Sequence, residues 1–142
     1  MNIDINSKGF HSSGMTHFTP SETYDLCCMG ALLVDVRENY INAYKMFQVE
    51  NVIYCPFSTF QNSLQKFSPD QFLILADSAG LKSKEAVMFL KNHGFGNVYN
   101  MAGGMIEWER DGLPIHIDIS ERLTGSCMCQ LKPRERKNKN KK

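Results

Sequence analysis

Apolar stretches alternate with short polar segments along most of the chain, and this pattern predicts a series of strands and helices. Residues 31–36 and 72–76 are nearly continuous apolar runs, typical of strands buried on both faces of a parallel sheet. Two further strands are expected over 52–55, where a proline follows, and over 97–101. The four runs together indicate a sheet that lies inside the molecule.

The segments between these runs carry helical signals. Thr19, Pro20 and Glu22 form the pattern of a helix start, with Thr19 as N-cap and Glu22 placed to complete a capping box. Apolar residues recur at helical spacing over 59–67 and 84–92. Short helices are also expected within 39–45 and from Gly103 through Trp108, so helices follow strands along the chain.

This alternation predicts one three-layer α/β domain, in which helices flank a central, mostly parallel sheet of about five strands. A chain of 142 residues is long enough to bury a core without disulfides or metal. Residues 1–16 show no period and are expected to form a flexible lead. The domain is then expected over 17–117, followed by a C-terminal extension over 118–142.

Cysteine content and hydropathy favour a soluble cytoplasmic protein. Five cysteines, an odd number in a chain with its own core, are more typical of a reducing compartment than of a disulfide framework. Cys27 and Cys28 are adjacent on a predicted helix and cannot both face inward, so one is expected to be exposed. The N-terminus lacks a signal-peptide pattern, and no apolar stretch is long enough to span a membrane.

The charge is concentrated at the C-terminus. Residues 131–142 hold seven Lys/Arg and one Glu, so they carry +6; because the whole chain carries +1, residues 1–130 carry −5. A solvated, disordered tail is the expected structure. The alternative is that this tail contacts an acidic partner or RNA. The basic tail alone does not favour a nucleic acid as that partner.

The segment after the 72–76 strand is the main candidate site. Loops at the carboxyl ends of parallel strands gather at one edge of the sheet, where backbone amides and a helix N-terminus can bind an anion. Asp77 stands at the mouth of this loop, and a carboxylate among amide donors takes the place of an anionic substrate. The remaining candidate anion-binding residues are Ser78, Ala79, Gly80, Leu81, Lys82 and Ser83.

Three motifs resemble the rhodanese family of sulfurtransferase domains over roughly residues 17–117. Residues 35–38 read Asp-Val-Arg-Glu after a strand, residues 103–108 follow a Gly-Gly-x-x-x-Trp pattern, and residues 111–114 read Asp-Gly-Leu-Pro. The resemblance implies a rhodanese-like fold. The residues that carry this signature, expected to have structural roles, are Asp35, Arg37, Gly103, Gly104 and Trp108.

The resemblance also implies altered chemistry. In active members the loop reads Cys-Arg-x-Gly-x-Arg followed by Ser or Thr, and its cysteine carries sulfur as a persulfide. Here Asp77 stands at the cysteine position, and Ser78 and Lys82 replace the two arginines. A carboxylate cannot form a persulfide. The expected function is therefore a noncatalytic binding or regulatory module without a cofactor, whose partner is a protein or a small anionic ligand.

Other roles for Asp77 stay open. The side chain could cap the following helix, with no function beyond structure. It could also act as a nucleophile or general base in acid-base or phosphoryl-transfer chemistry. Aspartyl-phosphate enzymes have a second Asp two residues later, where this chain has Ala79, so this hypothesis has less support.

Cys127 and Cys129 supply an alternative sulfur chemistry. Nearby Lys and Arg would favour their thiolate forms. They could carry sulfur, form a disulfide or simply be unused, and a Cys-x-Cys pair without other ligands is weak evidence for a metal site, so none is expected. The alternative function is a sulfurtransferase or sulfur carrier that uses Cys127, Cys129 or a partner's thiol.

Overall fold

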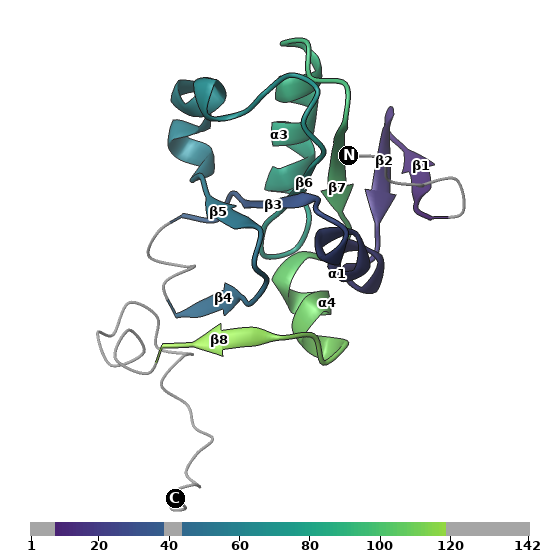
Figure 1. Ribbon diagram of the computed structural model, residues 1–142, viewed down its shortest axis with the longest axis vertical. Coiled ribbons are helices and arrows are strands. Elements are labelled where there is room, and N and C mark those ends of the chain that lie inside the picture. The colour runs from purple at the N-terminus through teal and green to yellow at the C-terminus, as the bar shows by residue number, and fades with distance from the viewer. Residues whose placement is uncertain (1–7, 39–43, 119–142) are drawn as a thin grey trace, which may run out of the picture.

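The computed structural model describes residues 8–38 and 44–118 (Figure 1). Its main sheet has six strands in the order β1-β2-β7-β6-β3-β5, and every neighbouring pair is parallel except the antiparallel pair β1 and β2. The strands are β1 (Phe10–Ser12), β2 (Met15–Phe18), β3 (Leu32–Asp35), β5 (Val52–Tyr54), β6 (Leu73–Ala76) and β7 (Val98–Met101). The predicted mostly parallel sheet is confirmed.

Helices cover both faces of this sheet. They are α1 (Pro20–Cys28), the 3-10 helix η1 (Phe57–Lys66), α3 (Lys82–Lys91) and α4 (Gly104–Arg110). Side chains of η1 and α3 pack in one apolar core, and side chains of α1 and α4 pack in a second. Alternate residues of β6 point into the two cores, Leu73 and Leu75 into the first and Ile74 and Ala76 into the second. The three-layer prediction is confirmed.

The start of α1 has the predicted local structure. The Thr19 hydroxyl accepts a hydrogen bond from the Glu22 amide at 3.2 Å, and the Glu22 carboxylate accepts one from the Thr19 amide at 2.9 Å. Pro20 occupies the first turn, where its missing N–H costs nothing. The capping box is thus confirmed.

The N-terminal segment differs from the prediction of a flexible lead over residues 1–16. Residues 10–18 form a hairpin, and β2 then pairs in parallel with β7. The turn residues Ser13 and Gly14 both have positive φ, as a two-residue type I′ hairpin turn requires. Residues 1–7 lie outside the described residues. The hairpin adds two strands, β1 and β2, to the four that the apolar runs predicted, so the sheet has six strands rather than about five.

A second small sheet was not predicted. Strands β4 (Lys45–Phe47) and β8 (Ile115–Ile117) pair in antiparallel register. Three-residue strands carry too little alternation to be found from sequence, and their pairing joins distant segments. Of the helix expected within 39–45, residues 39–43 lie outside the described residues, and Lys45 belongs to β4.

Candidate functional site

The Asp77 carboxylate is surrounded by backbone amides of its own loop. Asp77 follows β6 directly and is only 6% exposed. Its Oδ1 accepts hydrogen bonds from the amides of Ala79, at 3.1 Å, and Gly80. Its Oδ2 accepts from the amides of Lys82 at 2.6 Å and Ser83 at 3.3 Å. Asp77 therefore fills an anion-binding nest and caps the first turn of α3.

The first turn of α4 is hydrogen-bonded to the backbone of the Asp77 loop. The amide of Met105 donates to the Asp77 carbonyl at 2.8 Å, and the amide of Ile106 donates to the Ser78 carbonyl at 3.1 Å. A Cβ at Gly104 would lie 2.5 Å from the Asp77 carbonyl oxygen, so only glycine allows α4 to approach this closely. The Gly-Gly motif thus shapes the loop from a distant part of the sequence.

Asp35 and Arg37 form a buried ion pair beside the loop. The Arg37 Nη2 lies 2.9 Å from the Asp35 Oδ2, and the Arg37 Nε lies 3.1 Å from Oδ1. The Arg37 amide also donates to Oδ1 at 3.0 Å, and Nη2 donates to the Lys45 carbonyl at 2.6 Å. The guanidinium carbon lies 5.0 Å from the centre of the Phe47 ring. Asp35 thus contacts both a backbone donor and a basic residue, as expected from the sequence, and the structural role of the pair stays a prediction.

Burial raises the pKa of Asp35 above its ordinary value, because water is excluded from the charged form. Arg37 opposes this shift through its hydrogen bonds and charge, and the negative charge of Asp77 adds to it. The folded protein thus binds a proton at Asp35 more tightly than the unfolded chain does.

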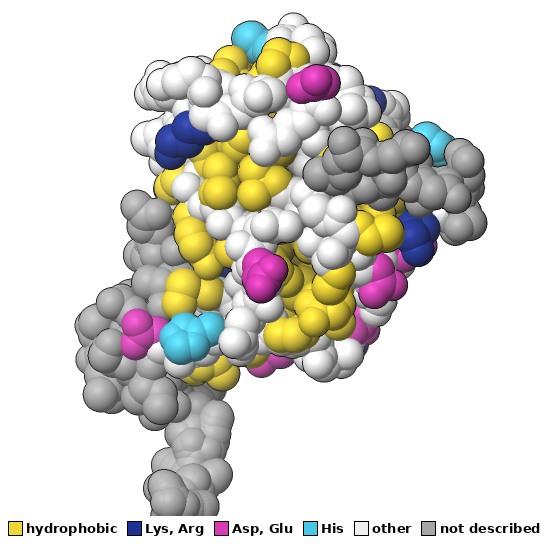
Figure 2. All heavy atoms as spheres, in the orientation of Figure 1, with side chains coloured by type: hydrophobic (Ala, Val, Ile, Leu, Met, Phe, Trp, Pro, Cys, Tyr) yellow, Lys and Arg dark blue, Asp and Glu magenta, His cyan; other side chains and the backbone are white. Residues whose placement is uncertain are grey.

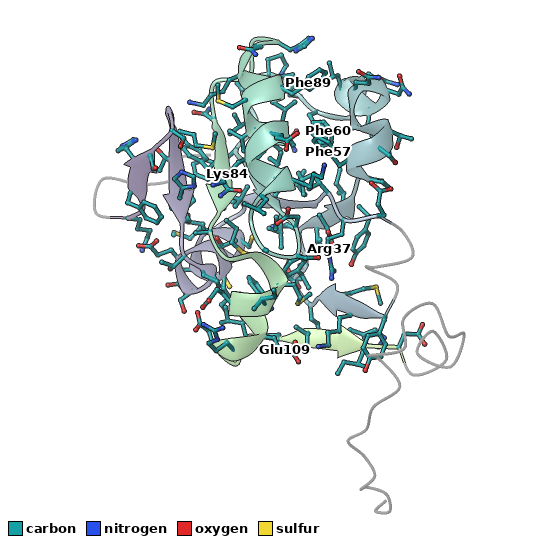
Figure 3. All side chains as sticks on the ribbon, turned by 180° about the vertical axis from the view of Figure 1, so that it is seen from behind. Arg37, Phe57, Phe60, Lys84, Phe89 and Glu109 are labelled. Carbon is teal, nitrogen blue, oxygen red and sulfur yellow. The ribbon has the colours of Figure 1, made fainter. Side chains whose placement is uncertain are left out.

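A pocket of about 530 Å³ opens in front of the loop. Its walls combine apolar side chains with both signs of charge; Figure 3 shows Phe57 between α3 and η1, with Arg37 beyond it toward β4. Leu81 at the rim is 65% exposed, and the Lys82 ammonium lies 5.0 Å from the centre of the Phe57 ring. The lining residues are Val36, Arg37, Glu38, Phe57, Ser58, Asp77, Ser78, Ala79, Leu81 and Lys82. The loop and Arg37 are therefore brought together, as parts of one site.

Sequence reasoning missed Phe57 and Ser58 as members of this site. Ser58 donates to the Glu38 carboxylate through its hydroxyl at 2.8 Å and its amide at 3.1 Å, which ties η1 to the segment after β3. The available signal was indirect: the segment that follows Pro56 lies at the carboxyl end of a predicted strand, so it belongs at the same sheet edge as Asp77.

The other predicted residues lie away from the pocket. Trp108 is fully buried, and its Nε1 donates to the Pro114 carbonyl at 2.8 Å, which fits the packed aromatic expected there. Cys27 is buried and Cys28 is exposed, as predicted, and burial together with the neighbouring Cys28 raises the pKa of Cys27 to about 12. Cys127 and Cys129 lie outside the described residues.

The described part of the chain contains neither a cluster of potential metal ligands nor a helix that could span a membrane. No group of three or more His, Cys, Asp or Glu side chains within residues 8–38 and 44–118 could hold a metal ion. Over the same residues, no helix combines the length and apolar character needed to cross a membrane.

Comparison with known proteins decides the family. The family model described as a rhodanese-like domain matches residues 19–111, which is more than half of the chain. The chain belongs to the rhodanese-like family. The matched segment runs from the cap of α1 to the end of α4, so it contains the Asp77 loop, the Asp35–Arg37 pair and Gly104.

Curated relatives of this rhodanese-like domain include enzymes. A thiosulfate sulfurtransferase GlpE from Haemophilus influenzae is 33% identical over 101 residues, which cover 68% of this chain and 90% of the relative. A tRNA uridine(34) hydroxylase from Hamiltonella defensa is 33% identical over 96 residues. The match covers 61% of this chain but only 26% of that longer protein.

Solved structures share the fold. A rhodanese-related protein from Thermoplasma volcanium matches with a TM-score of 0.64 and 22% identity, over 72% of this chain and 98% of that one. A polysulfide-sulfur transferase from Wolinella succinogenes matches with a TM-score of 0.65 and 24% identity, over 72% and 78%. These matches support the rhodanese-like α/β architecture.

Proposed function

We propose that this rhodanese-like domain is a noncatalytic binding module, in which Asp77 occupies the position of the family's persulfide-forming cysteine. One observation carries the proposal: four backbone amides of the loop, those of Ala79, Gly80, Lys82 and Ser83, donate to the Asp77 carboxylate. These donors would otherwise stabilise an anion delivered by a substrate. The loop therefore keeps an anion-binding conformation around a group that cannot carry sulfur.

A small anion is disfavoured as the ligand of this nest. The amides already have an acceptor, and a second anion would meet the negative charge of Asp77 at close range in a partly buried site. Phosphoryl transfer by Asp77 is also disfavoured, because both oxygens of its carboxylate already accept hydrogen bonds from backbone amides. The ligand is expected in the pocket, in front of the nest.

The pocket suits a segment of a partner protein. Its apolar wall, formed by Val36, Phe57 and the exposed Leu81, would bury an apolar side chain, and the nearby Lys82 ammonium would attract an acidic neighbour. On the face seen in Figure 2, apolar side chains gather in several patches that polar groups and backbone separate. The pocket thus combines concavity, apolar lining and charge.

Restoring a thiol tests the proposal. Wild type, Asp77→Cys and Asp77→Ser are exposed to thiosulfate or a low-molecular persulfide, and added sulfur is located by intact mass and peptide mapping. We expect no adduct on the loop peptide of wild type or of the Ser control, and an adduct at position 77 of Asp77→Cys, since the loop amides are placed to stabilise the persulfide anion. Thiosulfate:cyanide turnover by wild type would contradict the proposal.

The alternative is sulfur handling by Cys127 or Cys129. The 33% identity to a thiosulfate sulfurtransferase over 90% of its length favours a test of this second candidate. Replacing both cysteines with Ser in an otherwise unchanged chain should abolish sulfur loading if they carry it. Mapping is essential, because the exposed thiol of Cys28 can also react.

A further inference from the structure

A line of buried polar side chains connects the N-terminal hairpin to the first turn of α3. The Ser83 hydroxyl donates to the Asn100 Oδ1, and the Asn100 Nδ2 lies 2.9 Å from the His17 Nδ1. The His17 Nε2 lies 3.0 Å from the Ser12 carbonyl oxygen. Ser83, Asn100 and His17 are 0%, 1% and 4% exposed. Polar groups buried this deeply are costly unless each has a partner, and here each has one.

The hydrogen bonds of this line run in one direction. A carbonyl oxygen only accepts, so the His17 Nε2 carries a proton and donates a hydrogen bond to the Ser12 carbonyl. In a neutral ring, Nδ1 is then an acceptor, and it accepts a hydrogen bond from the Asn100 side-chain amide. The Asn100 carbonyl remains free to accept from Ser83. The order of donors and acceptors along this line of side chains therefore fixes both the tautomer of His17 and the orientation of the Asn100 amide.

The backbone places these groups in register. His17 of β2 lies opposite Asn100 of β7, and Asn100 lies opposite Leu75 of β6, two residues before Asp77. Figure 1 shows β1 and β2 side by side at the edge next to β7, with α3 packed on the sheet. Phe10 covers His17, with ring centres 5.0 Å apart. The hairpin that the sequence did not predict is therefore linked to Ser83 of α3 through Asn100 of β7.

Ser83 is the link to the site. Its hydroxyl is held by Asn100, while its amide donates to the Asp77 carboxylate at 3.3 Å. The neighbouring Lys82 amide donates to the same oxygen at 2.6 Å. A contact that holds Ser83 in place therefore also holds the end of the loop, where α3 begins.

We propose that His17 and Asn100 are positioning residues for the Asp77 loop, which act by holding Ser83 so that the α3 amides reach the carboxylate. The importance of this role rests on the proposed function of the loop as the binding site. The role itself is a property of the loop geometry, and it can be measured without any ligand.

Two substitutions at His17 separate positioning from general stability. His17→Asn keeps an acceptor near the position of Nδ1, facing Asn100, and loses the donor to Ser12; His17→Gln keeps the donor to Ser12 and loses the acceptor. Both remove the same buried ring, so both are expected to lower global stability to a similar extent. The readout is hydrogen exchange of the Lys82 and Ser83 amides in the full chain, measured by NMR and compared with global unfolding.

We expect the Lys82 and Ser83 amides to lose about tenfold more protection from hydrogen exchange in His17→Gln than in His17→Asn. The reason is that His17→Gln leaves the buried Asn100 amide donor without an acceptor. Asn100→Leu should lower it at least as much. Val98→Ala is the control, because it removes buried volume from the same strand outside the polar line, and it should change these amides only through global stability. Equal protection in the two His17 variants would overturn the proposal, whatever their stability.

A spectroscopic readout and a functional one complete the test. The ring nitrogens of His17 in wild type should show the neutral tautomer with the proton on Nε2, and the opposite tautomer would also overturn the proposal. In the Asp77→Cys background, His17→Gln should slow sulfur loading by about tenfold relative to His17→Asn. If Asp77→Cys takes up no sulfur at all, the proposed function is in doubt, while the exchange data still decide the role of His17.

Discussion

Asp77 and Asp35 are buried carboxylates at the ends of neighbouring parallel strands, and they are stabilised in different ways. Asp35 ends β3, Asp77 follows β6, and the two strands are paired so that Asp35 lies opposite Ala76. Asp77 accepts four hydrogen bonds from backbone amides of its own loop. Asp35 depends mainly on one side chain, the guanidinium of Arg37.

Asp77 is stabilised by groups of its own loop, whereas the stabilisation of Asp35 involves a side chain that also contacts a distant segment. Backbone amides stabilise the Asp77 charge without any second ion, so this arrangement survives wherever the loop keeps its shape. Arg37 brings a full positive charge that must itself be buried, and it also contacts Lys45 of β4. We therefore expect the Asp35 region to control stability and the Asp77 region to control the conformation of the site.

The largest effect is expected from Arg37→Met. This change leaves the Asp35 carboxylate buried without its cation, and breaking a buried ion pair in this way costs about 3–5 kcal/mol. Urea unfolding at neutral pH measures the loss. Arg110→Met is the matched control, because Arg110 forms an exposed ion pair with Glu107 that should contribute less than about 1 kcal/mol. Similar losses of stability in the two variants would mean that breaking the buried Asp35–Arg37 pair costs no more than breaking an exposed ion pair.

The second prediction concerns the approach of α4 to the Asp77 loop. Gly104→Ala puts a methyl group 2.5 Å from the Asp77 carbonyl oxygen, at a φ of +60°. Steric overlap and backbone strain together should cost about 2–4 kcal/mol and displace the loop. Gly112→Ala has a similar φ of +76° with nothing within 4 Å, so it isolates the strain alone. If thermal unfolding shows equal losses for both, close packing of α4 is not what fixes the loop.

The third prediction removes the acceptor from the nest. Asp77→Ala leaves the amides of Ala79, Gly80, Lys82 and Ser83 without their partner, which should cost about 1–3 kcal/mol in the free energy of unfolding. Water can enter the pocket in front of the loop and hydrate these amides, so the loss should be smaller than that of Arg37→Met. Ser78→Ala, in the same loop, should change stability by less than about 0.5 kcal/mol. A neutral Asp77→Ala would show that the nest does not depend on its carboxylate.

Sequence reasoning predicted this fold where the signals were local and repeated. The apolar runs of β3 and β6, the capping box at Thr19 and the helical spacing of α3 each lie within a dozen residues, and each is present in the structure. The position of Asp77 after a strand was also sufficient to place it at the sheet edge, where the structure shows that Arg37 lines the same pocket. Strand and helix periods determine which residues reach this edge.

The parts that escaped prediction depend on distant contacts. The pairing of β4 with β8 joins residues about seventy positions apart, and the hydrogen bond between His17 and Asn100 crosses from β2 to β7. A single His or Asn in a strand has no pattern that reveals its partner. The donors around Asp77 could be anticipated because a nest is built from consecutive residues, whereas the role of Gly104 follows only from the approach of α4.

The smallest effect is expected in the pH dependence of Asp35. Its pKa is raised in the folded protein, chiefly by burial, so the folded state keeps the proton at pH values where the unfolded chain has released it. The stability that Asp35 contributes is thus fully present below about pH 4, the ordinary range of an aspartic acid, and is lost as pH rises through the folded pKa. Asp35→Asn cannot titrate and should not show this loss. The free energy of unfolding of wild type relative to Asp35→Asn should therefore fall as pH rises above about 4, in parallel urea titrations. A relative stability that rises with pH instead would mean that Arg37 outweighs burial in setting the pKa of Asp35.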